Sequence, residues 1–193
     1  NGVFVFEVHS LSDMVKGLQY DWIYHEHLYY YSLLSLQKHF EWHGMTIFDV
    51  QDIDIHGGSR RYFVSKDGRK VLPSVTDAAQ IERWNGLDCL ATFRKFAQDV
   101  EGHRKQLQGL LKRLGGRVVG YGASGRANTV IQYCGLKLDY MVDDSPARQG
   151  LYTPGSHLEI RPKADPHDYT LVFAWTYLKD IAPKCERMIV PFP

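Results

Sequence analysis

The feature that most constrains the fold is a glycine-rich turn between an apolar strand and a helix. Arg117–Tyr121 predicts a strand, Ser124–Cys134 predicts a helix, and Gly120–Gly125 joins them with the pattern G-x-G-x-x-G. In this pattern the first glycine permits the tight turn, the second lets the backbone approach a phosphate, and the third lets the helix pack on the strand. The helix N-terminus also offers unpaired N–H groups to an anion. The turn therefore predicts a strand–helix unit that binds a nucleotide, with close packing alone as the alternative.

The residues after this turn continue to alternate between strand and helix patterns. We expect strands at Leu138–Asp143, Tyr169–Thr176 and Met188–Val190, and a helix at Leu178–Arg187. Alternation of this kind predicts parallel strands joined by right-handed crossover helices. The expected fold class is α/β, with a mainly parallel, Rossmann-like sheet and flanking helices.

The first part of the chain predicts an incomplete α/β unit that carries an antiparallel hairpin. Val3–Val8 is apolar almost throughout, which favours a strand covered on both faces. Met45–Asp54 and Arg60–Lys66 flank a glycine turn at His56–Gly58 and so predict the hairpin. Before it, Ser32–Phe40 predicts a helix that Ser32 caps.

A long helical stretch, Ser74–Leu114, separates these two parts of the chain. Gly86 is expected to break or bend its front, and Gly115 and Gly116 to end it. We therefore divide the chain into residues 1–72, a helical connector of residues 73–114, and a C-terminal domain of residues 115–193.

Composition narrows the possible functions of the 193-residue chain. Lys and Arg number 23 against 22 Asp and Glu, and this near balance argues against nucleic acid as a partner. No apolar run approaches the ~20 residues that span a bilayer. Three widely spaced cysteines argue against a disulfide framework and for a reducing compartment, so we expect a cytoplasmic protein. Because Asn1 leads straight into a strand pattern, we also expect a fragment of a longer protein.

The segment Tyr20–Tyr31 holds six aromatic residues, two histidines and two acids. Histidine is the default general base near neutral pH, and a carboxylate such as Glu26 or Asp21 could orient it. The alternative is a loop whose aromatics fill a core while its histidines make structural hydrogen bonds. The i, i+2 spacing of His25 and His27 differs from the helical i, i+4 spacing of metalloproteases, so we expect no metal.

Two other segments could contact an anionic ligand. The turn at His56–Gly58 exposes backbone N–H groups, and Arg60 and Arg61 after it could hold a diphosphate. Asp143 and Asp144 end a predicted strand ~20 residues beyond the glycine turn, where a ribose-binding acid is expected. The alternatives are an ordinary hairpin turn with solvated charges and a surface loop.

Taken in order, these segments resemble the S-adenosylmethionine-dependent sugar C-methyltransferases. The resembling motifs are Tyr24-His25-Glu26-His27, His56-Gly57-Gly58-Ser59, Gly120-Tyr121-Gly122-Ala123, Asp144-x-Pro146-x-x-Gln149-Gly150, Pro154-Gly155, Ala174-Trp175 and Val190-Pro191-x-Pro193. The resemblance covers essentially the whole chain. Ser124-Gly125-Arg126 departs from the family pattern, because it replaces a more alanine-rich, lysine-bearing turn.

Enzymes of this family have a cysteine-rich zinc-binding region, a middle methyl-donor domain and a C-terminal Rossmann-like domain. The resemblance implies that residues 1–72 are the tail of the methyl-donor domain, carrying the Tyr24–His27 motif. It also implies that zinc-binding and donor-binding segments lie upstream in the same polypeptide. The cofactor, S-adenosyl-L-methionine, is then expected to bind largely outside this chain, and the fragment to be inactive alone.

The implied reaction belongs to deoxysugar biosynthesis and acts on a nucleotide-linked keto-sugar. A base removes a proton next to the ketone, and the resulting carbanion takes a methyl group. By motif match, His27 is the base, Glu26 orients it or contacts the substrate, and Tyr24 donates a hydrogen bond to the oxyanion. The residues expected to bind substrate are His25, His56, Gly57, Gly58, Arg60, Gly120, Gly122, Ser124, Gly125, Asn128, Asp143 and Asp144.

Two alternative functions follow from the glycine turn. The chain could be a non-catalytic module that binds NAD or another nucleotide, or an NAD-dependent oxidoreductase with His27 as its acid.

Overall fold

A computed structural model describes residues 2–192, so Asn1 and Pro193, the last residue of the Val190–Pro193 motif, lie outside the described part. The chain divides into two compact units. The N-terminal unit comprises Asn1–Gln19 and Leu28–Gln98, and the C-terminal unit comprises Tyr20–His27 and Asp99–Pro193. The C-terminal unit therefore includes an early piece of chain, Tyr20–His27, which we call the 20–27 segment.

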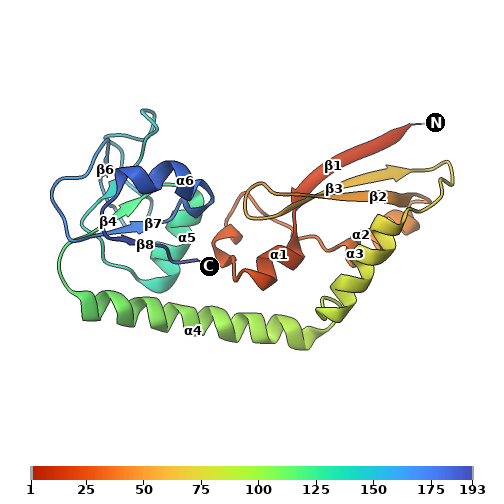
Figure 1. Ribbon diagram of the computed structural model, residues 1–193, viewed down its shortest axis with the longest axis horizontal. Coiled ribbons are helices and arrows are strands. Elements are labelled where there is room, and N and C mark those ends of the chain that lie inside the picture. Colours follow the sequence, from red (N-terminus) through yellow and green to blue (C-terminus); the bar gives the residue numbers. More distant parts are fainter. Residues whose placement is uncertain (1, 193) are drawn as a thin grey trace. The chain divides into compact units, whose positions relative to one another are not determined.

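The N-terminal unit contains a three-stranded antiparallel sheet (Figure 1). Its strands are β1 (Val3–His9), β2 (Thr46–Ile53) and β3 (Ser59–Ser65), in the order β1-β3-β2. The hairpin predicted from the glycine turn is confirmed as the β2–β3 pair, and His56, Gly57 and Gly58 in its turn all have positive φ. The expectation that the first strand is covered on both faces is wrong. Residues Val3–Val5 are exposed, so no layer covers both faces of this part of β1, which also lies at the edge of the sheet.

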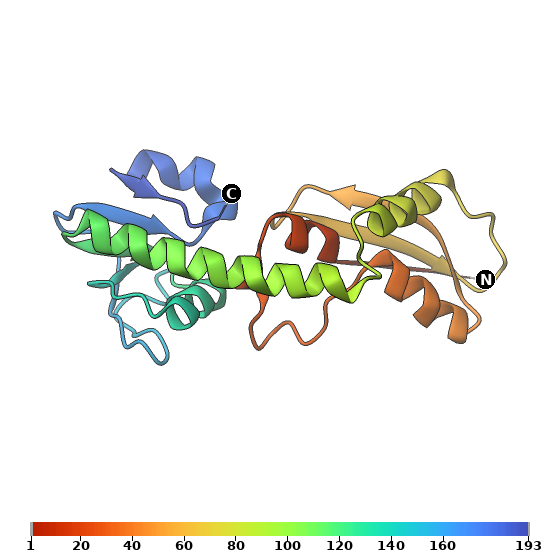
Figure 2. The ribbon, with the colours of Figure 1, turned by 90° about the horizontal axis from the view of Figure 1, so that it is seen from below.

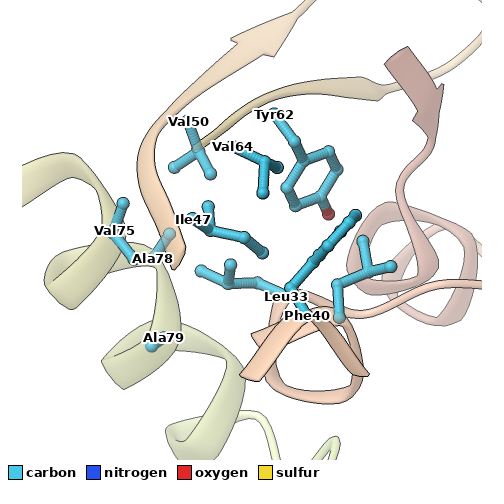
Figure 3. Packing of buried hydrophobic residues seen from close by; sticks show 10 residues of the cluster. Leu33, Phe40, Ile47, Val50, Tyr62, Val64, Val75, Ala78 and Ala79 are labelled. Atoms are coloured by element: carbon cyan, nitrogen blue, oxygen red, sulfur yellow. The ribbon is translucent and has the colours of Figure 1, made fainter. Parts of the chain in front are cut away.

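Helices α2 (Leu33–Trp42) and α3 (Pro73–Trp84) pack on β2 and β3 to form the core of this unit (Figure 3). Ser32 caps α2 as expected, because its hydroxyl accepts from the Ser35 N–H while the Ser35 hydroxyl accepts from the Ser32 N–H. The core side chains are Leu33, Leu36, Phe40, Ile47, Val50, Tyr62, Val64, Val75, Ala78 and Ala79. A short helix, α1 (Leu11–Lys16), precedes them in the chain.

The helical stretch is divided near Gly86, as predicted. Gly86 has a φ of 68° and separates α3 from α4 (Leu90–Leu114). Gly115 and Gly116, which also have positive φ, follow the end of α4. Figure 2 shows α4 as one continuous helix, although its residues up to Gln98 belong to the N-terminal unit and the rest to the C-terminal unit.

The C-terminal unit contains a five-stranded parallel sheet, which confirms the predicted Rossmann-like architecture. Its strands are β4 (Val118–Tyr121), β5 (Met141–Val142), β6 (Ile160–Arg161), β7 (Tyr169–Val172) and β8 (Met188–Ile189), in the order β6-β5-β4-β7-β8. Between β4 and β5 runs α5 (Gly125–Cys134), which Ser124 caps.

The helix predicted at Leu178–Arg187 is shorter than expected. Within that range the chain forms the helix α6 (Leu178–Ile181) and the turn η3 (Ala182–Lys184). A turn, η2 (Trp175–Tyr177), precedes them, so the strand predicted at Tyr169–Thr176 is also shorter and ends at Val172. Pro183 stops the helix because proline has no N–H to donate. Among the helices of residues 2–192, none is long and apolar enough to cross a bilayer.

Candidate functional site

The 20–27 segment folds as two successive turns that layer its aromatic rings. Tyr20–Trp22 forms a buried 3₁₀ turn, η1, and the His27 N–H then donates to the Tyr24 carbonyl at 2.9 Å. This second turn stacks the imidazole of His27 on the ring of Tyr24, with ring centroids 5.0 Å apart and planes 28° apart. The His27 ring also lies 5.1 Å from a Trp22 ring centroid. The ring of His27 therefore contacts the rings of both Trp22 and Tyr24, and the three form one layered group.

A cleft of about 710 Å³ lies between this segment and the first turns of α5. The 20–27 segment contributes Tyr24, His25 and Glu26 to its wall. The side chains and backbone that line the cleft come from Ile23, Tyr24, His25, Glu26, Ala123, Ser124, Gly125, Asn128, Thr129, Gln132, Tyr133, Thr153, Pro154 and Ile160. The structure therefore brings together six of the predicted site residues: Tyr24, His25, Glu26, Ser124, Gly125 and Asn128.

His27 lies beside this cleft, against the ring of Tyr24, and is partly exposed. Burial lowers the pKa of its imidazole, and the positive charge of Arg126 lowers it further, while the negative charge of Glu26 acts in the opposite direction. A lowered pKa keeps the imidazole neutral at neutral pH. A neutral imidazole has the lone pair that a proton acceptor needs.

Glu26 is close to two of the other residues in the motif. The Tyr24 hydroxyl donates to Glu26 Oε2 at 3.3 Å, and His25 Nε2 lies 3.9 Å from Glu26 Oε1. Both His25 and Glu26 are largely exposed. In the described part of the chain, residues 2–192, no three His, Cys, Asp or Glu side chains lie together so that they could hold a metal ion.

Each glycine of the G-x-G-x-x-G turn is in close contact with another part of the C-terminal unit. A Cβ on Gly120 would collide with the Met141 side chain, and one on Gly122 would lie 2.7 Å from the Ala174 Cβ. A Cβ on Gly125 would lie 2.9 Å from the ring of Tyr24. Close packing therefore accounts for all three glycines. Gly125, the third of them, forms the surface on which the ring of Tyr24 lies.

Asp143 and Asp144 lie at the carboxyl end of β5, where the sequence placed them, and both bind protein groups. Asp143 is buried and accepts from the Ala123 N–H at 2.7 Å and the Ser145 N–H at 2.9 Å, so it holds the glycine turn. Asp144 accepts from Lys184 and from the Tyr121 hydroxyl, both at 2.8 Å. These two hydrogen bonds, that of Lys184 first, lower the pKa of Asp144.

The His56–Gly58 turn belongs to the N-terminal unit, where other residues hold its backbone. The Gly57 carbonyl accepts from Gln19 Nε2 at 2.8 Å, and the Gly58 carbonyl accepts from the Ser10 N–H at 3.1 Å. His56 itself is exposed.

Arg60, two residues beyond this turn, is buried and paired with two carboxylates. Its Nη1 donates to Glu82 at 2.8 Å and its Nε donates to Asp52 at 2.6 Å. Glu82 is also buried, so the pair is an internal feature of the N-terminal unit.

Sequence reasoning missed the group of residues that holds the 20–27 segment. Asp21 was a candidate partner for a histidine, but its Oδ2 accepts from Arg126 Nε at 2.8 Å and from Trp175 Nε1 at 2.9 Å. The Arg126 guanidinium lies between the rings of Trp22 and Trp175. Two features of the sequence could have indicated this pair: Asp21 is an acid within an aromatic run, and Arg126 lies where the family pattern has a different turn.

Comparison with known proteins identifies the family. The profile described as "C-methyltransferase C-terminal domain" matches residues 54–190, most of the chain. C-methyltransferase NovU of Streptomyces niveus is 34% identical over 212 aligned positions, which cover all of this chain. The chain spans about half the length of that relative, since the alignment covers 50% of NovU. These two matches show that the chain belongs to the C-methyltransferase C-terminal domain family.

Proposed function

We propose that the chain is the C-terminal portion of an S-adenosyl-L-methionine-dependent C-methyltransferase that acts on a nucleotide-linked keto-sugar. One observation carries this proposal: Tyr24, His25 and Glu26 line the same cleft as Ser124, Gly125 and Asn128 at the start of α5. The first group offers proton-transfer chemistry, and the second offers a helix N-terminus to an anion.

The cleft suits a ligand of this class. Its volume of about 710 Å³ lies within the range of small-molecule sites. In our proposal the diphosphate lies at the N-terminus of α5, beside Ser124 and Gly125, and Asn128 contacts the same part of the ligand. The sugar then extends toward Tyr24 and the neighbouring His27.

The proposed reaction begins with proton removal from the carbon next to the sugar ketone. His27 takes the proton, the electron pair of the broken C–H bond forms the enolate, and the ketone oxygen becomes negative. Tyr24 donates a hydrogen bond to that oxygen, a contribution of about 3–4 kcal/mol for a comparable donor in other enzymes. The exposed carboxylate of Glu26 favours the protonated imidazole through its charge, and that proton returns to solvent.

In this proposal the segment that binds the methyl donor lies upstream in the same polypeptide. We therefore assign the donor no residue of this chain. When bound elsewhere in a longer polypeptide, S-adenosyl-L-methionine would supply an electrophilic methyl group to the enolate carbon.

Proton exchange without the methyl donor tests the proposal directly. The full product of the gene is incubated in D₂O with a thymidine diphosphate-linked keto-sugar, and NMR follows the loss of the proton next to the ketone. We expect exchange with the wild-type protein, a fall of about 10²–10⁴-fold in His27→Ala, and wild-type exchange in the control His39→Ala, which changes an exposed histidine on α2. Full exchange in His27→Ala would rule out His27 as the base.

Calorimetry separates this function from the oxidoreductase alternative. We expect the protein to bind the thymidine diphosphate sugar. Tight binding of NAD with no response to the sugar nucleotide would instead favour the NAD-dependent oxidoreductase.

A further inference from the structure

A buried ion pair joins the 20–27 segment to α5, and the rings of two tryptophans cover it. Asp21 is 1% exposed, and Arg126 places Nε at 2.8 Å and Nη2 at 2.6 Å from Asp21 Oδ2. The guanidinium carbon lies 4.1 Å from a Trp22 ring centroid and 4.8 Å from a Trp175 ring centroid. Trp175 also donates its indole N–H to Asp21. Arg126 thus contacts all three of the other residues in this group.

This group is connected to the proposed base through ring contacts. The Trp22 ring that covers Arg126 also lies against the ring of His27, and His27 stacks on Tyr24. Tyr24 in turn rests on Gly125, the residue before Arg126. Two consecutive residues of α5 therefore support the segment, Gly125 beneath Tyr24 and Arg126 beneath Trp22.

We propose that Arg126 is a positioning residue, which holds Asp21 and Trp22 so that Tyr24 and His27 keep their places beside the cleft. Arg126 does not line the cleft and in this proposal does not touch the substrate. The consequence for catalysis rests on the proposed function, whereas the physical claim, that Arg126 orders the segment, does not.

Arginine makes contacts at this place that lysine could not make. A planar guanidinium can stack between two indoles while it donates hydrogen bonds in its own plane to a carboxylate. A lysine ammonium would keep the charge but would lose the stacking and the planar contact. Burial raises the pKa of Asp21, while the charge of Arg126 and the Trp175 N–H act against this rise and favour the carboxylate.

The first test uses this chain and needs no substrate. We compare Arg126→Lys and Arg126→Met with wild type, and use Arg113→Met, at an exposed position of α4, as the matched control. Amide hydrogen exchange reports on the 20–27 segment through the N–H groups of Ile23, Tyr24 and His27, which are bonded within it. NMR of labelled histidine follows the His27 ring. We expect faster amide exchange and an altered ring environment in both Arg126 variants and neither change in Arg113→Met.

The histidine titration separates the charge of Arg126 from its contacts. The charged groups that act on His27 are Glu26 in its own segment and Arg126 on α5. Loss of the positive charge in Arg126→Met should raise the pKa of His27, while Arg126→Lys should leave that pKa closer to the wild-type value. If Arg126→Met does not fold, Arg126→Lys decides through amide exchange. Wild-type segment protection in a folded Arg126 variant would overturn the proposal.

The second test measures proton exchange with the keto-sugar in the full product of the gene. For Arg126→Lys we expect kcat to fall by about 100-fold, because a misplaced base loses its reacting geometry, with KM unchanged. A rise in KM with unchanged kcat would contradict a positioning role. If His27→Ala kept full exchange, the proposed base would be wrong, but the amide-exchange result for Arg126 would stand.

Discussion

At the scale of single residues, the site depends on charges that act on His27 from opposite directions. Burial lowers the pKa of the His27 imidazole most; the negative charge of Glu26 acts against this, and the positive charge of Arg126 lowers the pKa further. We predict that Glu26→Gln lowers the pKa of His27, because the neutral amide no longer stabilises the imidazolium. Histidine NMR titration measures this change, and Glu41→Gln, on an exposed part of α2, is the control. A pKa that rises in Glu26→Gln would contradict the assignment.

A second prediction concerns Gly125, whose missing Cβ leaves room for Tyr24. In Gly125→Ala the added Cβ would lie 2.9 Å from the ring, so Tyr24 must move away. We expect proton exchange on the keto-sugar to fall by about 10–100-fold, because a displacement below 1 Å already disturbs the reacting geometry. Thermal stability should change little, since alanine favours the helix more than glycine does. Gly109→Ala, which meets only ordinary contact on α4, is the control.

The residue scale also shows where sequence reasoning succeeds and fails. The glycine spacing predicts the β4–α5 turn correctly, because each step of that turn depends on local sterics. The pairing of Asp21 with Arg126 could not be read from the sequence, since it joins side chains 105 residues apart. The residues around Asp21 do not indicate whether its partner is Arg126 or one of the nearby histidines, His25 and His27.

At the scale of elements, a buried carboxylate joins two helices and a strand in the N-terminal unit. Glu82 on α3 accepts from the Leu33 and Leu34 N–H groups at the start of α2, and from Arg60 on β3. It therefore satisfies two helix N–H groups that would otherwise lack intrahelical partners. We predict that Glu82→Ala destabilises the unit by about 3–5 kcal/mol, because it leaves a buried arginine without this partner.

Urea denaturation measures the loss in free energy of unfolding, and Glu41→Ala, at an exposed position of α2, serves as the matched control. A loss no larger than that of the control would show that Asp52 alone can satisfy Arg60.

The helices and strands were predictable where local signals are strong. Ser32, Gly86 and Ser124 mark helix boundaries, and the structure confirms each of them. The prediction that strand Val3–Val8 is covered on both faces was wrong, because an apolar run indicates hydrophobicity but does not indicate how many neighbouring strands or helices pack against it. Its position at the edge of the sheet depends on pairing with β3, more than fifty residues later.

At the scale of the whole molecule, two compact units predict two unfolding events. Calorimetry should show that Glu82→Ala lowers the melting temperature of one transition, while Arg126→Met lowers that of the other. The effects of the two substitutions should add in a double variant, because Glu82 and Arg126 share no hydrogen-bond partner among residues 2–192. A single transition that both substitutions shift would contradict independent unfolding.

Strand β1 has a further consequence for how this chain behaves in solution. Val3, Phe4 and Val5 are each 38–51% exposed, and within residues 2–192 only β3 pairs with this strand. The other edge of β1 therefore presents unpaired backbone N–H and C=O groups next to exposed apolar side chains. An edge of this kind can pair with a strand of another molecule. We therefore expect the chain to self-associate at high protein concentration. The substitution Phe4→Lys should delay this association, which light scattering measures.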